Sequence, residues 1–244
     1  MRSRLAPLEI VPLGDSALII RVRVDFESDP EGCLRAVSAV LRRLQRANLR
    51  GVLDVAPAFT SVSVFYDPAK VAASGAPDDK IYEWLESKVR ALVDVSLHKK
   101  SAAPEPRSVE IPVCYDAEFA PDLDVVAVRA NMTAADVVAA HSAATYHVGC
   151  IGFAPGFPYL TGLPPALATR RRTTPRTQVA AGSVAIGGAQ TGIYPQSSPG
   201  GWNIIGRTPQ RLFDHRREPP SFLAMGDAVR FRRITRSEFE ALSE

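Results

Sequence analysis

Strand-like and helix-like patterns alternate along the first part of the chain. Leu8–Val11 and Ala17–Val24 are predicted as strands on either side of a Gly14–Ser16 turn, because the second segment is rich in β-branched residues. A helix is predicted next, since Pro30 suits a first helical turn and apolar residues then recur at helical spacing as far as Leu44. The chain is therefore expected to begin with two strands and an amphipathic helix.

The same alternation continues toward residue 100. Gly51–Ala56 and Thr60–Tyr66 predict a pair of strands, and the second has the apolar and polar alternation of a half-buried sheet. Apolar positions from Ile81 to Leu92 predict a second helix. A sheet with both helices on one face, of the ferredoxin-like type, is the economical α+β arrangement for residues 1–100.

A second unit is predicted after a polar, proline-containing linker at residues 101–108. Val109–Val113 alternates in the manner of a strand. Thr133 and Asp136 have the spacing of a capping box, which predicts the start of a helix that runs to His141.

Beyond this helix the pattern changes to short apolar runs separated by glycine and proline. Of the 16 glycines, 12 lie at Gly149 or beyond, and from Tyr146 onward the pattern is that of short strands and turns. Such a pattern is typical of a compact β-barrel or sandwich. We therefore expect a barrel domain at residues 109–244, with the barrel itself at residues 145–235.

Composition and charge narrow the class of protein. The formal net charge is +3, which argues against a dedicated nucleic-acid surface or a polybasic membrane patch. No apolar run approaches the roughly 18 residues that a membrane span needs. The N-terminus lacks a continuous apolar stretch of the signal-peptide type, so a cytoplasmic location is expected.

Some kinds of chemistry are excluded by residue usage. Residues 101–244 contain no lysine, so a GxxxxGK[ST] phosphate loop or a Schiff-base lysine does not lie there. The three cysteines are scattered without a CxxC pair, which predicts neither a disulfide nor a thiolate metal site. Four histidines without HxH or HExxH spacing predict no protein-bound zinc.

The segment from residue 152 to residue 208 carries the candidate chemistry. Its polar and aromatic groups fall between glycines and prolines, in the kind of loop where a rigid scaffold usually presents a site. These groups are Ser183, Gln190, Thr191, Tyr194, Ser198 and Trp202.

The motifs of this segment resemble those of the B subunits of bacterial ATP-dependent 5-oxoprolinases, a family also called allophanate hydrolase subunit 1. The family includes an inhibitor of a sporulation histidine kinase. The resemblance covers essentially the whole chain and rests on His141, Gly152–Leu160, Pro175–Arg176, Ala181–Val184, Gly187–Gly188, Gln190–Gly192, Tyr194–Pro195 and Ser198–Trp202.

The resemblance implies a ferredoxin-like domain followed by a cyclophilin-like β-barrel, in agreement with the pattern above. It also implies a non-autonomous hydrolase that opens a cyclic amide with ATP, together with the A and C subunits of 5-oxoprolinase. ATP is expected to be shared with or bound by these partners. Ala180 and Thr169 stand where the family usually has proline, which puts the loop geometry around Arg170–Arg172 in doubt.

Opening a lactam such as 5-oxoproline requires a clamp for the substrate carboxylate. Arg176 and Arg207 are the candidates, because a guanidinium can bind a carboxylate bidentately. The alternative is that each is a surface or structural arginine.

The reaction also needs donors at the developing oxyanion and a group that transfers a proton. Gln190, Tyr194 and the backbone amides of Gly187 and Gly188 are expected near the acyl oxygen, with Ser183 as a further substrate-binding candidate. His141 falls on the family motif and is the acid or base candidate. The alternative for this histidine is a packing role in the core.

Two other functions stay open at this point. The first is binding and inhibition of a sensor histidine kinase, and the second is a carboxyltransferase-like role in urea or allophanate metabolism. If the chain is one subunit of a larger enzyme, the aromatic residues of Phe153–Leu160 should lie partly at its surface for a partner to cover.

Overall fold

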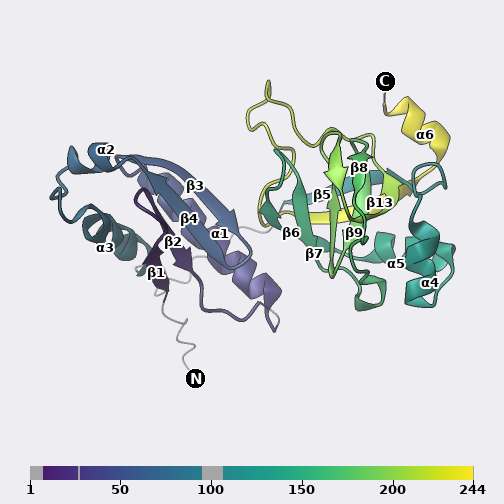
Figure 1. The fold of residues 1–244 in the computed structure, drawn as a ribbon, viewed down its shortest axis with the longest axis horizontal. Helices are drawn as coiled ribbons and strands as arrows, with labels where there is room; N and C mark the ends of the chain where they lie inside the picture. Colours follow the sequence, from purple (N-terminus) through teal and green to yellow (C-terminus); the bar gives the residue numbers. More distant parts are fainter. Residues whose placement is uncertain (1–7, 27, 95–106, 244) are drawn as a thin grey trace. The chain divides into compact units, whose positions relative to one another are not determined.

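The computed structural model describes residues 8–26, 28–94 and 107–243. The chain divides into two compact units, Met1–Glu105 and Pro106–Glu244. Most of the predicted linker, residues 101–106, and His98 lie outside the described residues. Each unit has its own sheet and its own helices (Figure 1).

The first unit contains an antiparallel four-stranded sheet in the order β1-β2-β4-β3. Its strands are β1 (Glu9–Pro12), β2 (Ala17–Arg21), β3 (Val52–Ala58) and β4 (Ser61–Tyr66). These are the four predicted strands, with bounds that differ by a few residues. Alternation sends Leu18, Ile20, Val62 and Val64 to the buried face of the sheet.

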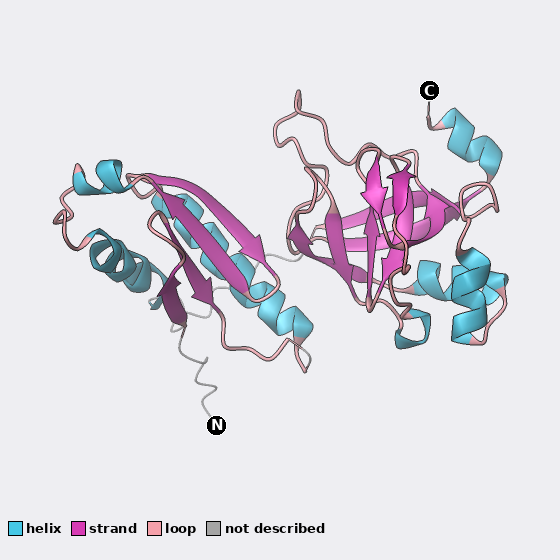
Figure 2. Ribbon diagram, in the orientation of Figure 1, coloured by secondary structure: helices cyan, strands magenta, loops and turns pink. Residues whose placement is uncertain are grey.

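Two long helices, with a short one between them, complete this unit (Figure 2). They are α1 (Pro30–Ala47), α2 (Pro68–Ala72) and α3 (Ile81–Asp94), of which the sequence pattern does not predict α2. Pro30 occupies the first turn of α1, as expected, and the Asp29 side chain caps the helix by accepting from the Gly32 N–H at 2.8 Å. The ferredoxin-like pattern holds, with β1 supplying the edge strand from the N-terminal side.

The second unit is built on a closed barrel with strand order β10-β7-β6-β13-β5-β12-β9. The strands are β5 (Ser108–Cys114), β6 (Tyr146–Ile151), β7 (Pro158–Thr161), β9 (Ser183–Gly187), β10 (Gln190–Ile193), β12 (Asn203–Arg207) and β13 (Ala228–Ile234). The fold class predicted from the sequence, α+β with a C-terminal barrel, is confirmed.

The barrel begins earlier in the chain than the expected residues 145–235. Strand β5 belongs to it and lies parallel to β13, whereas the other neighbouring strands of the barrel are antiparallel. Local periodicity gives no sign of this pairing, because the two strands come from opposite ends of the unit. Parallel neighbours need a long connection, and here that connection is most of the domain.

Smaller elements surround the barrel. They are α4 (Leu123–Ala130), α5 (Ala134–Ala143), α6 (Arg236–Ala241), the 3-10 turn η2 (Pro165–Leu167) and a two-stranded sheet of β8 (Arg176–Val179) and β11 (Ser198–Gly200). The predicted capping box of α5 is present, since Thr133 and Asp136 exchange side-chain to backbone hydrogen bonds of 3.1 Å.

The wall formed by β9, β10 and β12 separates two apolar clusters. Val184, Ile186, Ile193 and Ile205 point into the barrel and belong to its main core. Residues at the alternate positions of the same strands, such as Ala185 and Ile204, pack outside the barrel in a second cluster with Phe157, Tyr194 and Trp202. Side chains of this region therefore divide between an enclosed interior and an outer face.

Candidate functional site

His141 lies inside the barrel and is completely buried. Its Nδ1 is 2.9 Å from the Tyr115 hydroxyl and its Nε2 is 3.2 Å from Thr191 Oγ1. The Thr191 hydroxyl donates to the Ala185 carbonyl at 3.0 Å, so it accepts from the Nε2–H of the imidazole. Nδ1 then accepts from Tyr115, and the ring stacks on Phe231 with centroids 4.6 Å apart.

This environment fixes His141 as a neutral imidazole. Burial lowers its pKa from the ordinary value to about 3. Both ring nitrogens are already hydrogen-bonded within the interior, and no part of the side chain reaches solvent. The arrangement gives His141 the packing role that was the alternative, and leaves it no contact through which to exchange a proton with a substrate.

Tyr194 lies on the other side of the barrel wall. Along β10 and the residue after it, Thr191 and Ile193 point inward, while Gln190, Gly192 and Tyr194 are at the alternate positions. The expectation that His141 would share one cleft with Gln190 and Tyr194 is therefore wrong. Alternation within this short segment is the signal in the sequence that separates them.

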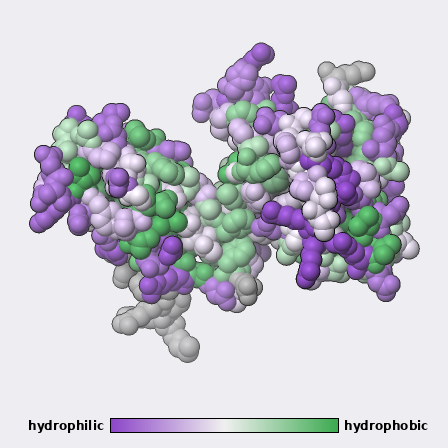
Figure 3. Space-filling model, viewed as in Figure 1, coloured by the Kyte–Doolittle hydropathy of each residue, from purple (hydrophilic) through white to green (hydrophobic). Residues whose placement is uncertain are grey.

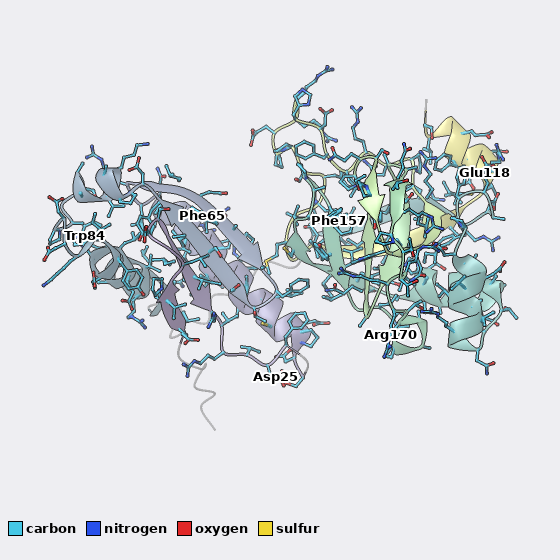
Figure 4. All side chains as sticks on the ribbon, viewed as in Figure 1. Asp25, Phe65, Trp84, Glu118, Phe157 and Arg170 are labelled. Carbon is cyan, nitrogen blue, oxygen red and sulfur yellow. The ribbon has the colours of Figure 1, made fainter. Side chains whose placement is uncertain are left out.

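Five aromatic side chains gather on the outer face, and we call them the outer aromatic cluster: Phe153, Phe157, Tyr159, Tyr194 and Trp202. Phe157, labelled in Figure 4, is its centre, with ring centroids 4.9 Å from Tyr159, 5.2 Å from Tyr194 and 5.6 Å from Trp202. Phe153 contacts Phe157 and Tyr194 but is 63% exposed. The predicted partial exposure of Phe153–Leu160 is thus concentrated in Phe153.

The density of glycine in this region follows from the same cluster. A Cβ added at Gly187 would lie 2.4 Å from the Trp202 ring, and one at Gly200 would lie 2.3 Å from the Tyr194 hydroxyl. Backbone without side chains therefore provides the floor on which these rings lie.

Gly188 and Ser183 do not offer the free groups that the sequence suggests. The Gly188 N–H donates to the Thr169 carbonyl at 2.8 Å and is therefore occupied. Ser183 is 4% exposed, its N–H donates to Ala180, and its carbonyl accepts from Tyr194. Among the described residues, the site therefore does not contain the predicted oxyanion donor at Gly188.

Arg176 binds a carboxylate, but that carboxylate belongs to the chain. Its two terminal nitrogens donate to Asp122 at 2.8 and 2.9 Å, and Arg172 donates to the same side chain at 2.9 Å. The Ile204 N–H supplies a fourth hydrogen bond of 2.7 Å. Asp122 is 2% exposed, so a buried carboxylate with four donors fixes both arginines.

The loop that carries these arginines is fastened to β12. The Arg172 N–H donates to Gly201, and the Asn203 side chain donates to the Arg170 carbonyl at 2.9 Å. Arg170 and Arg171 are exposed, and the Arg171 guanidinium lies 5.6 Å from the centroid of the Trp202 ring. A rigid loop thus holds two exposed cations beside the outer aromatic cluster.

Arg207 lies apart from this arrangement. Its Nε donates to the Ala181 carbonyl at 2.9 Å, and its guanidinium lies near the rings of Phe119 and Phe239. Arg176 and Arg207 do not form the joint clamp that was expected. Asp122, which organises the site, is not among the predicted residues, because nothing in its local sequence distinguishes it from a surface aspartate.

Known proteins identify the family to which this architecture belongs. The carboxyltransferase domain family, subdomains C and D, matches residues 8–223. The 5-oxoprolinase B subunit of Bacillus subtilis (strain 168) is 37% identical over 242 residues, which are 97% of this chain and 97% of that protein. The chain belongs to the family of 5-oxoprolinase B subunits.

Other proteins extend the comparison of this 5-oxoprolinase family member. The 5-oxoprolinase B subunit of Escherichia coli O157:H7 is 38% identical over 216 residues, covering 88% of this chain and 93% of the relative. The solved structure of TTHA0988 is 35% identical with a TM-score of 0.73 over 89% of this chain. The chain spans 39% of the length of TTHA0988, so this fold also occurs within a longer polypeptide.

Neither a metal-binding cluster nor a membrane-spanning helix occurs in the described part of this family member. Among residues 8–26, 28–94 and 107–243, no group of three or more His, Cys, Asp or Glu side chains is placed to hold a metal ion. In the same ranges, no helix combines the length and apolarity needed to cross a bilayer.

Replacing Gly187 with alanine is expected to destabilise the barrel unit by about 1–3 kcal/mol, because the new methyl group overlaps the Trp202 ring. Denaturant unfolding followed by tryptophan fluorescence measures this loss. Gly188→Ala is the matched control for steric contact: a Cβ there meets nothing within 4 Å, although its φ of +68° adds some backbone strain. Equal stability of G187A and the wild type would contradict the packing account.

Proposed function

We propose that this chain is a non-autonomous subunit of an ATP-dependent 5-oxoprolinase, which hydrolyses 5-oxo-L-proline to L-glutamate together with the A and C subunits of the enzyme. The observation that carries the proposal is the 37% identity to a 5-oxoprolinase B subunit over nearly the full length of both proteins. The name of that relative also supports partner subunits. Inhibition of a sensor histidine kinase and a role in urea or allophanate metabolism are the alternative functions.

The outer face of the barrel supports a shared rather than a complete site. Phe153 is a large apolar side chain left mostly exposed beside an otherwise buried aromatic cluster. Arg170 and Arg171 stand exposed nearby, and none of the ion pairs among the described residues includes either of them. Exposed aromatic and arginine side chains are enriched where protein surfaces meet, so we assign this face to the partner contact.

ATP is assigned to the partner subunits or to a site shared with them. The residues of the barrel domain contain no lysine for a phosphate loop of the GxxxxGK[ST] type. The interior imidazole of His141 is likewise closed to a nucleotide or a substrate. This chain therefore contributes binding and positioning groups to the proposed reaction, and the partners contribute the phosphoryl chemistry.

Co-expression with the neighbouring subunits, followed by an assay of glutamate release from 5-oxo-L-proline, tests the proposal. We expect release with ATP from the purified complex and none from this chain alone. Full ATP-dependent hydrolysis by the isolated chain would show that it is autonomous. A purified complex without 5-oxoproline hydrolysis would contradict the proposed reaction.

A further inference from the structure

A cavity of about 290 Å³ opens on the barrel unit, next to the outer aromatic cluster. Three segments wall it: the turn that contains Pro155, the residues Pro195 and Gln196 that follow Tyr194, and the long connection between β12 and β13. That connection projects from the barrel in Figure 1, and its projecting part is hydrophilic in Figure 3. Neither His141 nor the arginines bound to Asp122 line this cavity.

Backbone contacts give the cavity a defined wall. Phe213 and Ser221 form an isolated bridge, and the Asp214 N–H donates to the Pro220 carbonyl at 2.9 Å, so the projecting connection is closed at its base. The turn on the opposite side packs directly against it: a Cβ at Gly156 would lie 2.8 Å from Phe213 Cβ. Positive φ at Gly156 permits this close approach.

The polar groups of the cavity combine cations with one oriented carboxylate. Arg211 and Arg216 line it together with His215 and Asp214. One Asp214 oxygen accepts the Arg216 N–H at 3.0 Å, and the other is 3.3 Å from the Arg211 guanidinium. These interactions lower the pKa of Asp214, so the site presents an ionised acceptor beside two guanidinium groups.

Apolar groups complete the lining. Pro155, Pro195 and Phe213 supply flat hydrocarbon surface on which a small ring can lie. The volume is at the lower end of the range for ligand pockets, roughly 300–1,000 Å³, which suits a small acid better than a nucleotide. A ligand matched to this lining carries an anionic group, an N–H donor and an apolar ring.

We propose that this cavity binds a small cyclic carboxylic acid with a ring N–H, which on the proposed function is 5-oxo-L-proline. The Arg216 guanidinium binds the carboxylate, Asp214 accepts the lactam N–H, and the ring packs against Phe213 and the two prolines. This assignment rests on the proposed function for the identity of the ligand, and on the cavity alone for its chemical class. It replaces Arg176 as the substrate clamp, because Asp122 occupies that guanidinium.

The test uses the co-purified complex and the isolated full chain with variants R216Q and D214N. Arg217→Gln is the matched control, because Arg217 is an exposed neighbour that does not line the cavity. Two probes are titrated by calorimetry: 5-oxo-L-proline, and cyclopentanecarboxylate, which has the carboxylate and ring without the N–H. The KM of the complex for 5-oxo-L-proline is measured in parallel.

We expect R216Q to weaken both probes by about tenfold or more, because each loses a charge-assisted hydrogen bond. D214N should weaken 5-oxo-L-proline and leave cyclopentanecarboxylate unchanged, since its amide keeps the oxygen that accepts the Arg216 N–H but loses the second acceptor. R217Q should leave both affinities at the wild-type value.

The outcomes separate the two proposals. An active complex whose KM and probe affinities are unchanged in R216Q and D214N would overturn the cavity assignment and leave the proposed function intact. If the complex is inactive, the direct titrations decide: binding of the cyclic acids that R216Q weakens supports the cavity, and absence of binding overturns it. Refolding failure of D214N is checked by circular dichroism, with R216Q carrying the test in that case.

Discussion

Replacing Asp122 with alanine is expected to destabilise the barrel unit by about 3 kcal/mol, the low end of the range for breaking a buried ion pair. The carboxylate is 2% exposed and accepts four hydrogen bonds, so its removal leaves two guanidinium groups and the Ile204 N–H without their acceptor. The low end applies because the side chains of Arg172 and Arg176 are 35% and 25% exposed and retain some hydration.

Urea unfolding of D122A and of D124N measures this effect. Asp124 is an exposed residue in the first turn of α4 and serves as the control for loss of a carboxylate near the same helix. Trp202 gives a local signal, because release of the arginine loop removes Arg171 from above its ring. A D122A protein as stable as D124N, with unchanged tryptophan emission, would show that Asp122 does not hold this loop.

Acidification is expected to weaken the fold through His141. Its pKa is about 3 in the folded state against about 6.5 in an unfolded chain, so the unfolded state binds the proton first as the pH falls. The stabilising effect is complete above pH 6.5 and is lost between there and pH 3. By about pH 5 the loss from this residue amounts to about 2 kcal/mol.

Comparing the pH dependence of unfolding for wild type and H141Q isolates this contribution. Glutamine keeps a donor and an acceptor for Thr191 and Tyr115 but does not titrate, so H141Q should be less stable at about pH 7 and lose less stability between about pH 7 and pH 5. His215→Gln is the control, since His215 is exposed. Parallel pH profiles for H141Q and the wild type would contradict the buried neutral imidazole.

The elements and the fold class are predictable from the sequence, because both depend on local periodicity. The 3.6-residue spacing after Pro30 and the alternation around Val62 and Val64 identify a helix and a strand without reference to the rest of the chain. The parallel pairing of β5 with β13 is not predictable in this way, since no local pattern records which distant strand completes a barrel.

The candidate site is less predictable, for two physical reasons. Residue type correctly singles out Arg176 as a group that binds a carboxylate bidentately, but its partner Asp122 lies 54 positions away and only the fold brings them together. His141 matches a family motif, and burial rather than residue type decides whether an imidazole titrates. The glycines of the segment indicate close approaches to the backbone, and the Trp202 and Tyr194 rings are what approaches them.

Reconstitution of the complex with and without this chain tests the central claim most directly. The partner subunits are purified without it, and glutamate release from 5-oxo-L-proline with ATP is measured as the chain is added back. The account predicts no release without the chain and release that rises to a plateau at a fixed ratio of subunits. Full activity of the partners alone, or no activity at any amount of added chain, would contradict it.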